Sequence, residues 1–304
     1  MRAALLLIVV AACGPAMRDR PGDDDSGSNT GSDVGSGTAR QCDKMDIVFV
    51  VDDSGSMAEE QQNLATNFPM FAQLLSQYQV NGMPLDFRVG LTTTGRTVSY
   101  NVAVPGFGTL PQSETGDNGA FKDTCGSTAR FLQSSDPNVD QTLACRANVG
   151  TSGPSVEMPM LMSKYALGDR ITDGTNGQFL RPDALLAIIY LTDEDDQSQT
   201  MDGFTLDASG NAPTDWNPSD QVAFLDQLKG DRTRWALAAI AGDGNCSSSF
   251  GMASDAVRLK QLVQLANGQG TQQAVFSSIC DGDLTIGLKK ALDTFQSACG
   301  QIIL

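Results

Sequence analysis

Three oxygen-bearing side chains follow an apolar stretch near the start of the chain. Asp52, Ser54 and Ser56 alternate along one short turn, directly after the apolar run from Ile47 to Val51. Carboxylate and hydroxyl oxygens are the ligands that a hard divalent cation such as Mg²⁺ takes in proteins. The apolar run predicts a buried strand, and open α/β sheets bind ligands at the carboxyl ends of their strands. The segment therefore predicts a cation-binding loop at that edge of a sheet.

Two later loops offer further oxygen ligands. Thr151 precedes a helical stretch, and Asp193 follows the apolar run from Leu185 to Leu191. Together with the first loop, they resemble the metal-ion-dependent adhesion site of von Willebrand factor type A (vWA) domains, as found in secreted bacterial vWA lipoproteins. The candidate ligands are, in chain order, Asp52, Ser54, Ser56, Thr151 and Asp193.

The resemblance implies a binding site rather than an active site. Mg²⁺ prefers octahedral geometry at about 2.0–2.1 Å and keeps waters where the protein offers no ligand. In the vWA family, an Asp or Glu of a partner protein fills the open position. We therefore expect a divalent cation, Mg²⁺ with Mn²⁺ or Ca²⁺ as alternatives, shared with a protein partner. Residues 42–304 are expected to form the domain, a doubly wound, mostly parallel α/β sheet with helices on both faces.

Each candidate ligand also has a simpler interpretation. Asp52 is a preferred residue type for capping the helix that follows it. Ser152 lies beside Thr151 and is able to replace it, and the Gly-Pro-Ser run at 153–155 departs from the family pattern. Asp53, which the ligand pattern skips, is expected to face solvent.

An acidic run follows the last candidate ligand. Glu194, Asp195 and Asp196 come directly after Asp193. Runs of like charge usually stay in water, so we expect a solvated loop. The alternative is a second cation site, for which flexible carboxylates favour Ca²⁺.

The first residues predict export and anchoring. A positive start precedes the apolar run from Ala3 to Ala12, and Val10 to Cys13 is typical of a bacterial lipobox. Residues 1–13 are thus expected to be a signal peptide with Cys13 lipidated, the alternatives being a plain cleaved signal or a misassigned start. The composition of residues 14–41 predicts a flexible tether. The absence of Asp after Cys13 favours the outer membrane or cell surface over the periplasm.

Cysteine usage agrees with an exported chain. The sequence has seven cysteines, and an even number remains beyond Cys13, which favours disulfides. Sequence alone leaves their connectivity open. The pairs that positions in the chain favour are Cys42–Cys299 at the two ends of the domain, Cys125–Cys145 within one insertion, and Cys246–Cys280 in two late loops.

Charge and composition exclude several classes of function. The net charge of −16 argues against nucleic acid as a partner. The absence of histidine excludes Ser-His-Asp and Cys-His hydrolases and imidazole catalysis, so we expect no enzyme. One alternative is a metal-dependent phosphohydrolase with Asp52 as nucleophile or ligand, although Arg181 is expected at the opposite edge of the sheet. The other is an envelope structural protein with a vestigial site.

Hydrophobic periodicity predicts strands that alternate with helices, which implies a parallel sheet wrapped on both faces. Strands are expected at residues 47–51, 85–91, 184–192, 235–241 and 273–276. Helices are expected at 58–79, with a kink or break at Pro69, and at 153–168, 219–228, 254–266 and 283–298. For the second of these, Pro159 offers an alternative, later start. Polar insertions are expected at about 95–148 and 197–218.

Overall fold

The computed structural model describes residues 42–80, 82–248, 251–270 and 272–300. The predicted signal peptide, the lipidation site Cys13 and the tether at 14–41 lie outside these residues. In the described ranges, no helix combines the length and the apolar character needed to cross a membrane.

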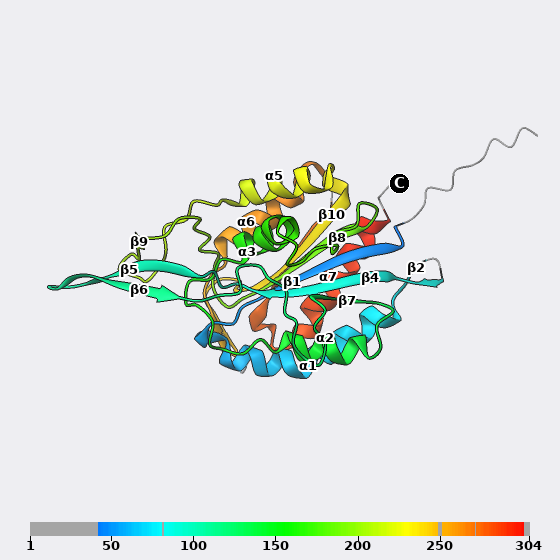
Figure 1. Cartoon of the computed structure of the whole chain (residues 1–304), viewed down its shortest axis with the longest axis horizontal. Coiled ribbons are helices and arrows are strands. Elements are labelled where there is room, and N and C mark those ends of the chain that lie inside the picture. Colours follow the sequence, from blue (N-terminus) through cyan, green and yellow to red (C-terminus); the bar gives the residue numbers. More distant parts are fainter. Residues whose placement is uncertain (1–41, 81, 249–250, 271, 301–304) are drawn as a thin grey trace, which may run out of the picture. The chain divides into compact units, whose positions relative to one another are not determined.

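A six-stranded sheet forms the centre of the domain, in the order β13-β10-β8-β1-β4-β7 (Figure 1). Its strands are β1 (Lys44–Val51), β4 (Asp86–Thr93), β7 (Phe131–Gln133), β8 (Leu185–Leu191), β10 (Trp235–Ala241) and β13 (Ala274–Ser278). All neighbours pair in parallel except β7, which runs antiparallel to β4. The strand order reverses at β1, because the chain extends the sheet first toward β4 and later toward β8. The expected doubly wound α/β fold is confirmed.

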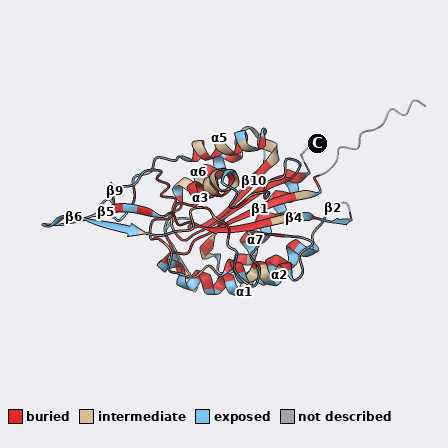
Figure 2. Ribbon diagram, viewed as in Figure 1, coloured by how far each residue is buried: buried red, intermediate tan, exposed pale blue. Residues whose placement is uncertain are grey.

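Helices cover both faces of this sheet (Figure 1). One face carries α1 (Ala58–Gln77), α2 (Val139–Ala147) and α7 (Leu284–Cys299). The other carries α3 (Pro159–Lys164), α5 (Pro218–Lys229) and α6 (Val257–Ala266). Figure 2 shows the central strands as a buried layer between helices that expose only their outer sides.

Strand β1 illustrates why the central strands are apolar throughout. Ile47, Phe49 and Val51 pack into the core beneath α1 and α7, whereas Val48 and Val50 pack into the core on the opposite face. Successive side chains of a strand point to opposite faces, so a strand covered on both sides needs apolar residues at every position. This burial fixes the register of the strand and hence the place where it ends, directly before the first candidate loop.

The two polar insertions contact each other beside the sheet. The first contains the hairpin of β5 (Val98–Val104) and β6 (Gly108–Glu114), and the second contains β9 (Phe204–Thr205), which pairs with β5. In Figure 1 the hairpin projects from the end of the domain where the parallel strands end. The first insertion is shorter than expected, because β7 joins the main sheet and α2 packs on α1. Two small hairpins complete the strands: β2 (Gln79–Val80) with β3 (Met83–Pro84), and β11 (Cys246–Ser248) with β12 (Gly251–Ala253).

Two helices differ from the prediction. Helix α1 runs unbroken through Pro69. Phe68 and Phe71 on either side of it are buried against Phe49, with ring centroids 5.0 and 5.4 Å away. Core packing therefore holds the helix together despite the lost hydrogen bond. The helix expected from residue 153 begins only at Pro159, a favoured first-turn position. It continues past residue 168 through a π-helical turn, Tyr165–Asp169, into α4 (Arg170–Thr172).

Three disulfides join the pairs that chain position favoured. Cys42 is bonded to Cys299, Cys125 to Cys145, and Cys246 to Cys280. The first ties the residue before β1 to the end of α7, across a separation of 257 residues. Such long loops gain the most from a cross-link in the chain-entropy account of disulfides.

Candidate metal centre

Hydrogen bonds from three strand ends fix the first residue of the candidate loop. The backbone N–H of Asp52 donates to the Leu191 carbonyl at 2.9 Å, so the pairing of β1 with β8 continues past β1. The buried Asp52 carboxylate accepts from the Ser54 backbone N–H at 2.8 Å and from the Thr192 hydroxyl at 2.6 Å. The Thr94 hydroxyl, which follows β4, donates to it at 3.4 Å. Asp52 is therefore held in one orientation by β1, β8 and β4.

Two segments far apart in the sequence meet beside this aspartate. Ser54 Oγ and Ser56 Oγ lie 3.0 Å apart, and the Ser56 hydroxyl donates to Asp193 Oδ1 at 3.3 Å. The Asp193 carbonyl accepts from the Ser254 backbone N–H at 2.8 Å, which fixes the loop after β8. Ser54 and Asp193 are buried, whereas Ser56 is exposed. The structure thus clusters four of the five predicted ligands and opens the cluster to solvent at Ser56.

The acids of this cluster lack positive partners. Burial raises the pKa of Asp52, although the hydrogen bond from Thr192 acts to lower it. Burial, followed by the charge of Asp52, raises the pKa of Asp193 to about 7. Within the described residues, neither acid forms an ion pair with Lys or Arg. The two carboxylates therefore repel each other in a buried setting, which costs free energy unless a cation or a proton is bound.

The donor atoms fit a hard divalent cation. All of them are carboxylate or hydroxyl oxygens, which suit Mg²⁺, Mn²⁺ or Ca²⁺. Glu60, on the first turn of α1, is 3% exposed, and its Oε2 has no hydrogen-bond partner among the described residues. The charge of Glu60 contributes to raising the pKa of Asp193. Across the part of the chain that the structure describes, no three Asp, Glu, His or Cys side chains converge closely enough to hold a metal by themselves. The hydroxyls of Ser54 and Ser56 are therefore needed to complete a ligand set.

The loop that contains Thr151 lies next to the cluster, but Thr151 itself is exposed. The Gly153 N–H donates to the Asp53 carbonyl at 2.7 Å, and a Cβ at Gly153 would lie only 2.1 Å from Asp53 Oδ1. Glycine is thus required for this close approach. The role of Thr151 as a ligand stays a prediction. The expectation that Asp53 faces solvent is wrong, because this loop covers its side chain, and burial raises its pKa to about 7.

Sequence reasoning missed three residues that line the cluster. The hydroxyls of Thr94 and Thr192 both donate to Asp52. Glu157 lies two residues before α3 with its side chain buried, and burial, followed by the charge of Asp52, raises its pKa. Thr192 was recognisable as the residue between a central strand and Asp193. Thr94 and Glu157 are brought in by long-range contacts that local patterns do not show.

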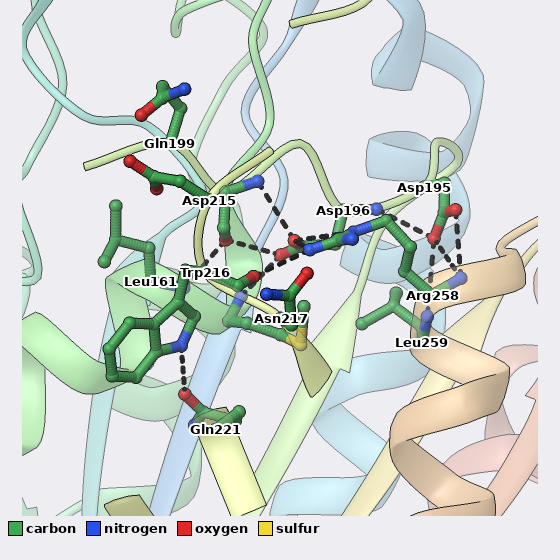
Figure 3. A network of polar contacts seen from close by, with 12 residues as sticks. Leu161, Asp195, Asp196, Gln199, Asp215, Trp216, Asn217, Gln221, Arg258 and Leu259 are labelled. Atoms are coloured by element: carbon green, nitrogen blue, oxygen red, sulfur yellow. Dashed lines mark hydrogen bonds and ion pairs between the residues drawn. The ribbon is translucent and has the colours of Figure 1, made fainter. Parts of the chain in front are cut away.

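Two residues of the acidic run after Asp193, Asp195 and Asp196, accept hydrogen bonds from the starts of two helices (Figure 3). Asp195 accepts from the backbone N–H groups of Arg258 at 3.0 Å and Leu259 at 3.3 Å, at the start of α6. Asp196 accepts from the Met160 N–H at 2.9 Å, at the start of α3, and pairs with Arg258 Nη2 at 3.4 Å. The expectation of a solvated loop is wrong for the fully buried Asp196, because the unpaired N–H groups of two helix starts draw these acids inward.

Comparison with known proteins gives weak likenesses. No family model matches the chain, and no curated protein is significantly similar to it. Proximal thread matrix protein 1 from the mussel byssus superposes with a TM-score of 0.43 and 15% identity, covering 84% of this chain and 49% of the mussel protein. The manganese-loaded TRAP protein of Plasmodium vivax superposes with a TM-score of 0.38 and 11% identity, covering 86% and 76%. The pilus adhesin RrgA of Streptococcus pneumoniae gives 0.29 and 13%, covering 51% and 21%.

The chain spans about half the length of the mussel protein that it matches. With TM-scores below 0.5, these likenesses bear on neither the ligand nor the partner of this chain. Its function has to be inferred from the cluster around Asp52.

Proposed function

We propose that the chain is a lipid-anchored vWA-type protein outside the cytoplasm, which binds a protein partner through a divalent cation. Asp52, Ser54, Ser56 and Asp193 hold the cation, and an Asp or Glu of the partner completes its coordination. The observation that supports this most is the contact of Ser56 with both Ser54, at 3.0 Å, and Asp193, at 3.3 Å. These residues lie beside the buried Asp52, which forms no ion pair within the described part of the chain.

The position of the cluster favours a shared cation. It lies at the carboxyl ends of β1 and β8, where the strand order reverses, and ligands of doubly wound sheets bind at this point. The exposed Ser56 leaves an approach from solvent. The hairpin β5–β6 and the strand β9 belong to the two insertions that begin next to the cluster, so these loops are placed to select the partner.

The disulfides support a location outside the cytoplasm. Three cross-links in one domain are typical of oxidising compartments. The lipid anchor at Cys13 and the tether at 14–41 belong to the proposal on the sequence pattern alone, as does the outer-membrane or surface location.

The position of Arg181 does not support the phosphohydrolase alternative. A phosphohydrolase needs Lys or Arg beside the cation to stabilise the transferred phosphoryl group. Arg181 is instead bonded to Asp46 at the amino end of β1, with Nε 2.8 Å from Oδ1. Incubation with generic phosphoesters and Mg²⁺ checks this, because turnover would favour the enzyme.

Isothermal titration with Mg²⁺ or Mn²⁺ tests the proposal directly. We expect the wild type to bind one cation per chain and the Asp52→Ala variant to bind none. The full chain should also retain an envelope protein that EDTA releases, and Asp52→Ala should not retain it. Absence of cation binding by the wild type would end the proposal.

A further inference from the structure

Glu157 lies between two segments that belong to the cation site. Gly95, just after β4, forms an isolated antiparallel bridge with Glu157, and the Met158 N–H donates to the Thr94 carbonyl at 3.0 Å. On its other side, the Gln197 N–H donates to the Glu157 carbonyl at 2.8 Å. The backbone of Glu157 is therefore fixed between the end of β4, whose Thr94 contacts Asp52, and the loop after β8.

The side chain of Glu157 forms no ion pair with any residue that the structure describes. It is 1% exposed, and its Oε2 accepts from Gln197 Nε2 at 3.3 Å. The same nitrogen donates to Glu194 Oε2, also at 3.3 Å, so two acids share one neutral donor. Burial, together with the charges of Asp52 and Glu194, raises the pKa of Glu157 well above its ordinary range. Burying such a group without an opposite charge is costly.

Thr151 differs from Glu157 in its exposure to solvent and in its position in the loop. Thr151 is exposed, whereas Glu157, two residues before α3, is buried. The loop therefore places a residue with a buried carboxylate, not the expected hydroxyl, beside the Thr94 segment, whose hydroxyl donates to Asp52.

We propose that Glu157, rather than Thr151, is the residue through which this loop acts on the cation, by accepting a hydrogen bond from a water molecule bound to it. The inference rests on the proposed function. Contact through water agrees with the absence, among the described residues, of three acids that converge on one point. Glu157 is thus a positioning residue, and groups that orient the first ligands typically affect metal affinity strongly.

Three variants test this inference, each measured by Mn²⁺ titration and by thermal unfolding of the metal-free protein. Glu157→Gln keeps the shape of the side chain and should bind Mn²⁺ about 10- to 100-fold more weakly than the wild type. Thr151→Val is the matched control in the same loop and should stay within about twofold of the wild type, as expected for an exposed position. Asp52→Ala should not bind.

Thermal unfolding separates a cation role from a structural one. Glu157→Gln removes a buried like charge, so its metal-free form should melt at the same temperature as the wild type or higher. Unchanged Mn²⁺ affinity in Glu157→Gln would overturn the inference, whatever its melting temperature. If that variant does not fold, Glu157→Asp, which keeps the charge but shortens the side chain, should still weaken binding, and unchanged affinity there would equally overturn it.

The variants also distinguish this inference from the proposed function. Loss of binding in Asp52→Ala with normal binding in Glu157→Gln contradicts only the role of Glu157. A larger loss of Mn²⁺ affinity in Thr151→Val than in Glu157→Gln also contradicts the role of Glu157. That result would support Thr151 as the ligand from this loop. A wild type that binds no Mn²⁺ contradicts both proposals.

Discussion

Strand β1 has a fully buried aspartate near each end, and the surroundings of the two differ. At the amino end, Asp46 accepts from the Arg181 backbone N–H at 2.6 Å and from Arg181 Nε at 2.8 Å. Burial raises the pKa of Asp46, and the charges of Arg181 and Lys229 oppose this rise. At the carboxyl end, Asp52 accepts hydrogen bonds only from neutral groups, and within the described residues it forms no ion pair.

The difference separates acids that stabilise the fold from acids that bind a ligand. Asp196 belongs to the first kind, because it caps α3 and pairs with Arg258. Asp52 and Asp193 belong to the second, because burial raises the pKa of both, the charge of Asp52 adds to the rise at Asp193, and neither forms an ion pair within the described residues. A fold that pairs Asp46 and Asp196 with arginines and leaves Asp52 and Asp193 without an ion pair among the described residues has sacrificed stability at one place, as functional sites commonly do.

The largest effect on stability is expected at the amino end of β1. Arg181→Met leaves Asp46 buried and unpaired, which should lower the free energy of unfolding by about 3–5 kcal/mol. Urea denaturation measures the loss, and the affinity for Mn²⁺ of the folded fraction should not change. A loss below about 1 kcal/mol, the value of a surface pair, would erase the distinction between the two ends.

At the carboxyl end, the expected effect depends on the cation. Asp52→Asn should leave the metal-free protein at least as stable as the wild type, because it removes a buried, uncompensated charge. Added Mn²⁺ should raise the free energy of unfolding of the wild type by about 2.7 kcal/mol when its concentration is about one hundred times the dissociation constant of the site. The Asp52→Asn variant should show no such increase. Thermal melts with and without Mn²⁺ measure both quantities. An Asn variant that is unstable without metal would place Asp52 among the structural acids.

A smaller effect is expected from pH. Burial raises the pKa of Asp193 and of Asp53 to about 7 in the folded protein, whereas unfolded carboxyl groups titrate near about 4. Between these values the folded state holds more protons than the unfolded state, so stability falls as pH rises. The metal-free protein should therefore melt at a higher temperature at pH 5 than at pH 8. Saturating Mn²⁺ should flatten this dependence, and a profile that metal does not change would speak against the site.

The smallest effect is expected from a surface pair close to Asp46. Lys44 forms an ion pair with Asp183, and both side chains are partly exposed. Exposed pairs contribute little because water screens them. Lys44→Ala should leave the melting temperature and the Mn²⁺ affinity unchanged. A clear loss of stability would mean that burial is not what distinguishes Asp46.

Local sequence was sufficient for the sheet and for most of the site. Asp52 and Asp193 each come directly or almost directly after an apolar run that suits only a central strand, so the doubly wound topology brings both to one edge. Ser54 and Ser56 follow from their spacing to Asp52. The same reasoning placed Arg181 at the opposite edge, where it pairs with Asp46.

The parts that escaped prediction depend on contacts between distant segments. Glu157 enters the site through its bridge to Gly95, and family resemblance pointed to the neighbouring hydroxyl of Thr151 instead. The edge strand β7, only three residues long, carries no periodicity by which to separate it from the insertion. Asp196 was expected in water because its role as a cap depends on where α3 begins.

Anomalous scattering from crystals of the wild type grown with Mn²⁺ tests most directly whether the unpaired acids form a cation site. The account predicts one manganese peak, within ligation distance of Ser54, Ser56 and Asp193 and beside Asp52. Crystals of the Asp52→Asn variant grown under the same conditions should show no manganese peak. A wild-type map without a peak at this position, at saturating Mn²⁺, would contradict the account.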